Sequence, residues 1–175
     1  MTRRFAYTVV VSSLALCLTF PGMVLAQSPA RVPSASIREG SMMSRANGTF
    51  EVKVTPQSAD GYADGATMGR LTLDKQFRGD LEGTSKGQML TAITSVKGSA
   101  GYVAVELVSG TIAGRGGSFI LQHSGTMSRG TQALTLTVVP DSGTDGLTGL
   151  TGTMVIIIAN GTHAYEFDYS LPRAP

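Results

Sequence analysis

The feature that most constrains the fold is a series of alternating apolar and polar segments joined by two-residue turns that contain glycine. Such turns are predicted at Gly114-Arg115, Arg129-Gly130 and Asn160-Gly161. Turns of this kind connect neighbouring antiparallel strands, because Gly accepts a positive φ without a steric clash. The pattern therefore predicts an all-β fold, a closed antiparallel up-and-down barrel of roughly eight strands, with a β-sandwich as the alternative.

The hairpin from Tyr102 to Met127 predicts which side chains face the interior. If Gly114-Arg115 forms a type II′ turn, Glu106 lies directly opposite His123. Because side chains alternate between the two faces of a strand, the large aromatic residues then share one face with this acid and this imidazole. The members of this predicted core face are Tyr102, Ala104, Glu106, Val108, Phe119, Leu121, His123 and Met127. The independent turn at Arg129-Gly130 predicts the same parity, with His123 opposite Leu136.

Three further strands are predicted before this hairpin, and in the first of them Phe50, Val52 and Val54 alternate with polar residues. Lys75 shares its alternation with Leu71, Leu73 and Phe77. A lysine at such a position can reach inward toward Glu106, but a place at the rim of the barrel, with the ammonium in water, is the expected one. Lys86-Gly87 is interpreted as a turn that precedes a strand over residues 89–96.

The N-terminal residues have the pattern of an export signal. Residues 1–26 contain two arginines, an apolar run and a small residue at Ala26, which together predict a cleaved signal peptide. A membrane anchor is the alternative, but the apolar run ends at Pro21-Gly22 and is short for a span of about 20 residues. Residues 27–43 are predicted to be a flexible linker and residues 44–171 the barrel domain. The exported protein is therefore expected in the periplasm or secreted, with no integral membrane segment after cleavage.

Charge and composition exclude several classes of function. Two of the 14 Lys and Arg residues lie in the predicted signal and none of the 12 acidic residues does, so the remaining chain is formally neutral. Nucleic-acid binding is not expected, because phosphate recognition needs a basic surface. The single cysteine, Cys17, also lies in the signal. With two histidines far apart in sequence, no metal site and no cofactor is predicted. The sequence does not indicate an oligomeric state.

Several segments resemble the bacterial domain-of-unknown-function family 3224 over most of residues 46–171. They are GTFEV at 48–52, DKQFRGDL at 74–81, KGSAGY at 97–102, GSFILQH at 117–123 and VPDSGT at 139–144. The resemblance implies a small barrel similar to allene oxide cyclase, a plant enzyme that cyclises a fatty-acid epoxide, and it implies no established activity. The acid in the first strand of the cyclase would fall near Glu51, which here has the parity of the polar face. Catalysis is therefore not carried over.

The interior face offers candidates for a site. Glu106 and His123 are the candidate acid–base pair, although a structural ion pair explains such residues more often. Tyr102, Tyr165, Tyr169 and Lys75 are the candidate ligand-binding residues, because tyrosines combine an apolar wall with a polar tip. The favoured function is binding of a small apolar or amphipathic ligand. The alternatives are an isomerase or cyclase that uses the acid–base pair, and a structural or interaction protein whose barrel is filled.

Overall fold

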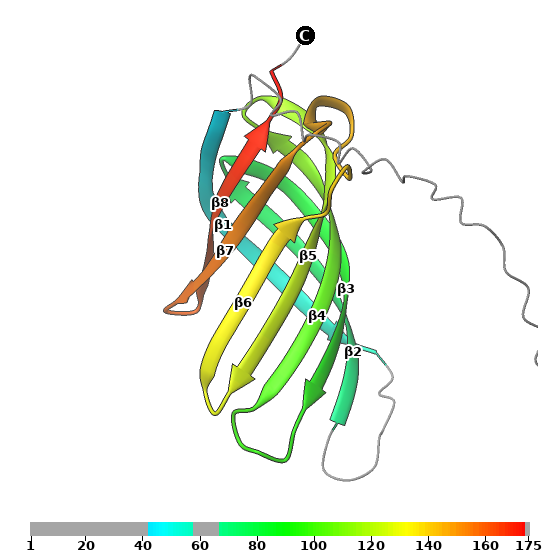
Figure 1. Ribbon diagram of the computed structural model, residues 1–175, viewed down its shortest axis with the longest axis vertical. Coiled ribbons are helices and arrows are strands. Elements are labelled where there is room, and N and C mark those ends of the chain that lie inside the picture. The colour runs from blue at the N-terminus through cyan, green and yellow to red at the C-terminus, as the bar shows by residue number, and fades with distance from the viewer. Residues whose placement is uncertain (1–41, 58–66, 174–175) are drawn as a thin grey trace, which may run out of the picture. The chain divides into compact units, whose positions relative to one another are not determined.

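A computed structural model describes residues 42–57 and 67–173 of the chain. Within these residues, eight antiparallel strands close into a barrel in sequence order (Figure 1). The strands are β1 (Met42–Pro56), β2 (Thr67–Gly79), β3 (Leu81–Ile93), β4 (Ala100–Ile112), β5 (Arg115–Ser128), β6 (Thr131–Val138), β7 (Thr151–Ala159) and β8 (Thr162–Leu171). The predicted up-and-down barrel is confirmed. A single 3-10 turn, η1 (Asp145–Leu147), is the helical element of the described part.

The predicted signal peptide at residues 1–26 and the linker up to residue 41 lie outside the described residues. The last two residues that the sequence analysis assigns to the linker, Met42 and Met43, belong to β1. They pair with Leu171 and Ser170 at the end of β8. The pairing of the first strand with the last is what closes the barrel.

Two of the predicted turns are confirmed. Arg129-Gly130 joins β5 to β6 with φ values of 49° and 92°, and Asn160-Gly161 joins β7 to β8 with φ values of 51° and 79°. Two positive φ angles define the type I′ turn, whose twist matches that of a hairpin. The first of these turns sets His123 opposite Leu136, as the sequence predicts.

The hairpin between β4 and β5 turns one residue earlier than the sequence analysis predicts. Its loop residues are Ala113 and Gly114, with φ values of 50° and 72°, so the turn is type I′ and not type II′. The pairing therefore shifts by two residues, and Glu106 lies opposite Leu121 instead of His123. A shift of two residues preserves the alternation of side chains, so both Glu106 and His123 still face the interior.

The predicted turn at Lys86-Gly87 is wrong, because β3 continues through both residues. The chain turns earlier, beside Gly79, whose φ of 109° favours glycine. Gly87 pairs with Glu106 of β4 inside the barrel wall. Glycine within a strand often marks a close approach by a neighbouring group, which is its role here.

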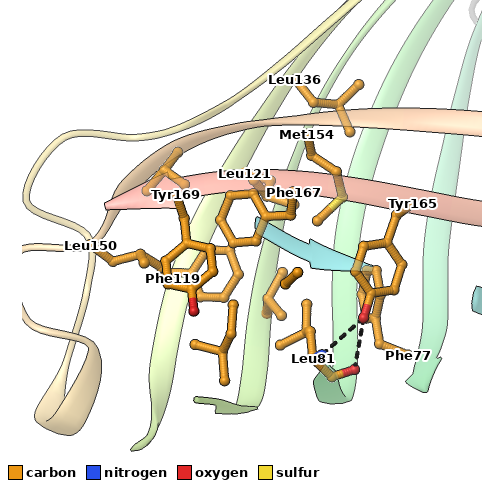
Figure 2. Close-up of a cluster of buried hydrophobic side chains, with 14 of the residues drawn as sticks. Phe77, Leu81, Phe119, Leu121, Leu136, Leu150, Met154, Tyr165, Phe167 and Tyr169 are labelled. Carbon is orange, nitrogen blue, oxygen red and sulfur yellow. Dashed lines mark hydrogen bonds between the residues drawn. The ribbon is translucent and has the colours of Figure 1, made fainter. Parts of the chain in front are cut away.

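One half of the barrel is filled with side chains (Figure 2). Phe119 stacks on Phe167 with 5.8 Å between ring centroids, and Phe77 meets the edge of Tyr165 at 5.7 Å. The Tyr165 hydroxyl accepts a hydrogen bond of 2.9 Å from the backbone N–H of Leu81. This polar tip is thus satisfied within an apolar core, as a buried tyrosine requires.

The connection from β6 to β7 contributes to the same half. Leu147 of η1 and Leu150 are fully buried in the core. Several hydrogen bonds tie the connection to β5. Among them, the Thr144 N–H donates to the Ser118 carbonyl at 2.9 Å, and the Ser118 N–H donates to the Thr144 hydroxyl at 3.0 Å. This end of the barrel is therefore plugged by its own chain.

The contact between β6 and β7 is much shorter than the others. Only two residue pairs join these strands in the described chain, Leu136 with Met154 and Thr137 with Thr153. β6 pairs with β5 along its whole length, and β7 does so with β8. In Figure 1 β6 and β7 diverge beyond their contact, toward the end that carries the β5–β6 and β7–β8 turns. In the filled half β6 and β7 are thus paired and close the barrel wall. In the other half these two strands are not paired with each other.

Candidate ligand-binding cavity

The second half of the barrel holds a cavity of about 560 Å³. All eight strands contribute to its wall, which is mainly apolar and includes Val52, Leu71, Leu73, Met89, Leu134 and Ile156. Ile93 and Ile158 also line it and expose 57% and 65% of their surface, so the mouth of the cavity is apolar as well. The volume is typical of small-molecule pockets, which span roughly 300–1,000 Å³.

Four buried polar side chains separate the cavity from the filled half, and we call them the polar layer: Lys75, Ser85, Glu106 and His123. Each comes from a different strand, β2 to β5. Glu106 is the centre, because its Oε1 accepts hydrogen bonds from Lys75 Nζ at 2.8 Å and from His123 Nε2 at 3.1 Å, and its Oε2 accepts one from the Ser85 hydroxyl at 3.0 Å. Lys75 and His123 line the cavity, whereas Glu106 and Ser85 do not.

The carboxyl group of Glu106 is held in its charged form. Burial opposes its ionisation, but the hydrogen bond from His123 and the adjacent charge of Lys75 outweigh that cost, so the pKa of Glu106 lies below its ordinary value of 4.5. Because a carboxylate only accepts hydrogen bonds, Nε2 of His123 must carry the hydrogen that points to Oε1. Nδ1 of His123 makes no hydrogen bond within the described part of the chain.

The ammonium group of Lys75 has capacity beyond its ion pair. One of its three N–H donors serves Glu106, and within the described residues no other hydrogen bond is made by it. Its charge lies 5.0 Å from the ring centroid of Phe50 and 5.8 Å from that of Phe77. Aromatic faces attract a cation, so these rings hold the ammonium group at the boundary of the cavity.

Two glycines make room for this arrangement. A Cβ at Gly87 would lie 2.7 Å from the Cβ of Glu106 and 2.8 Å from the carbonyl oxygen of Val105, so a larger residue would displace the acid. A Cβ at Gly125 would meet the ring of Tyr102, which lies across this glycine at the cavity wall. Burial, and then the negative charge of Glu106, raise the pKa of Tyr102 above its ordinary value of 10.0.

Comparison with known protein families identifies the family of this chain. The model of a family described as protein of unknown function (DUF3224) matches residues 46–169. The chain belongs to this family. A crystal structure of a DUF3224 protein of unknown function from Shewanella oneidensis MR-1 is similar, with 51% sequence identity and a TM-score of 0.72. The similarity covers 75% of this chain and 100% of that one. The comparison with curated proteins finds no match.

This DUF3224 barrel brings together part of the predicted site. Glu106 and His123 meet inside the barrel, and Tyr102 lines the cavity close to them, with 6.5 Å between its ring and that of His123. Tyr165 and Tyr169 do not line the cavity, because both are buried in the filled half. Of the three candidate tyrosines, Tyr102 therefore lies at this cavity, and the other two lie in the apolar core.

The expected rim position of Lys75 is also wrong. Its side chain is 5% exposed and points inward to Glu106, the alternative that the alternation of β2 left open. The closure of the barrel decides this, since β2 and β4 are not neighbours in the sheet and β3 lies between them.

Three residues of the site were not singled out from the sequence. Ser85 completes the coordination of Glu106, while Phe50 and His163 line the cavity and lie 5.2 Å apart between ring centroids. The alternation of β3 would have indicated Ser85, had Lys86-Gly87 not been interpreted as a turn. Phe50 shares its alternation with Val52 and Val54, and His163 shares its own with Tyr165, so both side chains face inward.

Glu51 is the residue of this sequence that would correspond to the first-strand acid of allene oxide cyclase. It is exposed and pairs with Gln76 on the outer face of the barrel. This position gives it no access to the cavity. In residues 42–57 and 67–173, no three His, Cys, Asp or Glu side chains are grouped as a metal site would need. No helix of the described part is long and apolar enough to span a membrane.

Proposed function

We propose that this protein binds a small apolar or amphipathic molecule in the open half of its barrel. The observation that carries the proposal is an apolar cavity of about 560 Å³ that ends on two polar groups, the ammonium of Lys75 and the imidazole of His123. Binding sites for small molecules combine mainly apolar walls with a few polar groups that fix the orientation of the ligand. The family membership adds no activity to this inference.

The geometry favours a binding protein over an acid–base enzyme. A catalytic base must come within hydrogen-bonding reach of the proton that it removes. Glu106 does not line the cavity, and three donors already occupy its two oxygens. The cavity also argues against a barrel that is filled throughout, which leaves binding as the best-supported function.

A pair of matched variants on β3 tests the proposal. Thr91 lines the cavity, and its neighbour Leu90 faces outward with 49% of its surface exposed. Thr91→Trp places a large ring in the cavity and should weaken the binding of dodecanol more than tenfold, measured by calorimetry. Leu90→Trp should leave the affinity unchanged. Equal effects, or no binding of dodecanol by the unmodified protein, would contradict the proposal.

The dependence of the binding affinity on the chain length of the ligand is a second test of the proposal. Burying one methylene contributes about 0.8 kcal/mol, which corresponds to roughly a fourfold gain in affinity. Across a series of linear alcohols the affinity should rise by this factor for each methylene until the cavity is filled, and then level off. An affinity that does not depend on chain length would mean that the chain is not buried.

We also infer that the protein acts outside the cytoplasm, on the basis of the charged and apolar pattern of residues 1–26. The expected mature N-terminus is Gln27. N-terminal sequencing of the protein recovered from the host checks this, and a chain that retains Met1 would refute it. An exported carrier of apolar molecules would keep them in solution between membranes or at the cell surface.

A further inference from the structure

The polar layer presents a specific combination of groups to the cavity. Lys75 and His123 line it, whereas the carboxylate that they share lies behind them. Lys75 has N–H donors beyond the one that serves Glu106. Because Nε2 of His123 is the donor to Glu106, Nδ1 of a neutral imidazole is an acceptor. The cavity therefore ends on one donor and one acceptor.

The charges of the layer cancel. The ammonium of Lys75 and the carboxylate of Glu106 form an ion pair at 2.8 Å, so these two charges compensate each other. An anionic headgroup brought to this place would remain unbalanced in apolar surroundings, at a high cost. A neutral headgroup meets no such penalty, so charge balance selects against a carboxylate or phosphate.

The layer is not explained by stability. Replacing a buried ion pair by apolar side chains of similar volume is often neutral or stabilising. This chain does place buried apolar side chains beside the polar layer. Leu121 and Leu136 are the residues paired with Glu106 and His123 on the adjacent strands. Of the four buried polar residues, Lys75 and His123 line the apolar cavity and are therefore placed where they can recognise a ligand, with Glu106 and Ser85 behind them.

We propose that the ligand is a hydroxyl-bearing apolar molecule, an alcohol or phenol, whose hydroxyl accepts a hydrogen bond from Lys75 and donates one to Nδ1 of His123. This assignment rests on the proposed binding function and specifies the chemical class of its ligand. A hydroxyl group is both donor and acceptor, so it satisfies the two groups at once. An ether accepts but does not donate and leaves Nδ1 without a partner.

Binding of dodecanol and of its methyl ether to the purified protein tests the assignment, by calorimetry at about pH 8, where an ordinary imidazole is neutral. Leaving a buried polar group unpaired is costly, so the alcohol should bind roughly tenfold more tightly than the ether. Dodecanoate, an anion of the same length, should bind more weakly than the alcohol. Equal binding of alcohol and ether would overturn the assignment and leave the proposed function intact, whereas binding of neither would overturn both.

Two matched variants of neighbouring residues on β5 locate the preference. His123→Phe removes the acceptor, so the alcohol and the ether should bind with affinities within about twofold of each other, as for two ligands that lack a differential hydrogen bond. Gln122→Phe makes the corresponding change on the exposed outer face of the same strand and should keep the tenfold preference. A preference that survives His123→Phe would refute the assignment.

Discussion

The two halves of the barrel are built from the same eight strands, but one half has a packed interior and the other encloses a cavity. In the filled half, aromatic side chains from opposite walls meet, the 3-10 turn η1 plugs the end, and β6 pairs with β7. In the other half the inward side chains leave a cavity of about 560 Å³ between them. Protein interiors are normally close-packed, so an unfilled half is a departure that stability does not explain. The comparison supports the proposed division between a half that stabilises the fold and a half that binds a ligand.

The largest expected effect on stability comes from truncating an apolar side chain in the filled half, compared with truncating one at the mouth of the cavity. Phe167→Ala leaves a void in the filled half and should lower the free energy of unfolding by about 4 kcal/mol, as for other buried aromatic residues. Ile158→Ala removes a side chain that is 65% exposed at the mouth of the cavity and should cost at most about 0.5 kcal/mol. Urea unfolding measures both. Similar losses would mean that the two halves contribute equally to stability.

The second prediction concerns the boundary between the halves. Glu106→Gln keeps the shape but leaves Lys75 without its counter-ion, and should cost about 3 kcal/mol near neutral pH. The pKa of Glu106 is lower in the folded than in the unfolded chain, so its contribution is present above the ordinary value of 4.5 and lost as the pH falls through the folded value. Urea unfolding as a function of pH should therefore show the difference between variant and parent shrinking on acidification below pH 4.5. A constant difference would mean that the ion pair does not contribute.

The third prediction uses the two glycines. Gly87→Ala brings a methyl group against the backbone of Val105, which cannot move away, and should cost about 2 kcal/mol. Gly125→Ala brings one against the ring of Tyr102, which can rotate into the cavity, so the cost should stay below about 1 kcal/mol. Thermal or urea unfolding compares the two. A larger loss at Gly125 would show that the cavity wall is rigid.

The smallest expected effect is on two tyrosines, one in each half. Burial raises the pKa of both Tyr102 and Tyr165 above 10.0. Dodecanol in the cavity should displace water from Tyr102 and raise its pKa further, while the pKa of Tyr165 stays the same. Spectrophotometric titration detects this, with Tyr102→Phe identifying the signal. A parallel shift of both tyrosines would mean that the ligand acts on the whole barrel.

The sequence predicts the local features of the barrel correctly. The turns at Arg129-Gly130 and Asn160-Gly161 lie where their turn residues indicate, and the inward positions of Glu106 and His123 follow from alternation alone. The register of β4 against β5 was wrong by two residues, because Ala113 adopts a positive φ that an alanine seldom does. The interruption predicted at Lys86-Gly87 was wrong for a related reason: a glycine can mark a turn or the close approach of a neighbour, and the chemistry of one residue does not distinguish them.

The sequence by itself determined the alternation of the strands, two of their turns and the face that each side chain takes, because these depend on neighbours one to four residues apart. The tertiary structure alone decided that Lys75, Ser85, Glu106 and His123 lie at one level of the barrel, and that the space beyond them stays open. Both facts depend on the stagger of four strands around a closed sheet, a relation between residues as far as 48 positions apart in the chain. Packing at that distance is set by the whole closed barrel, and no local pattern encodes it.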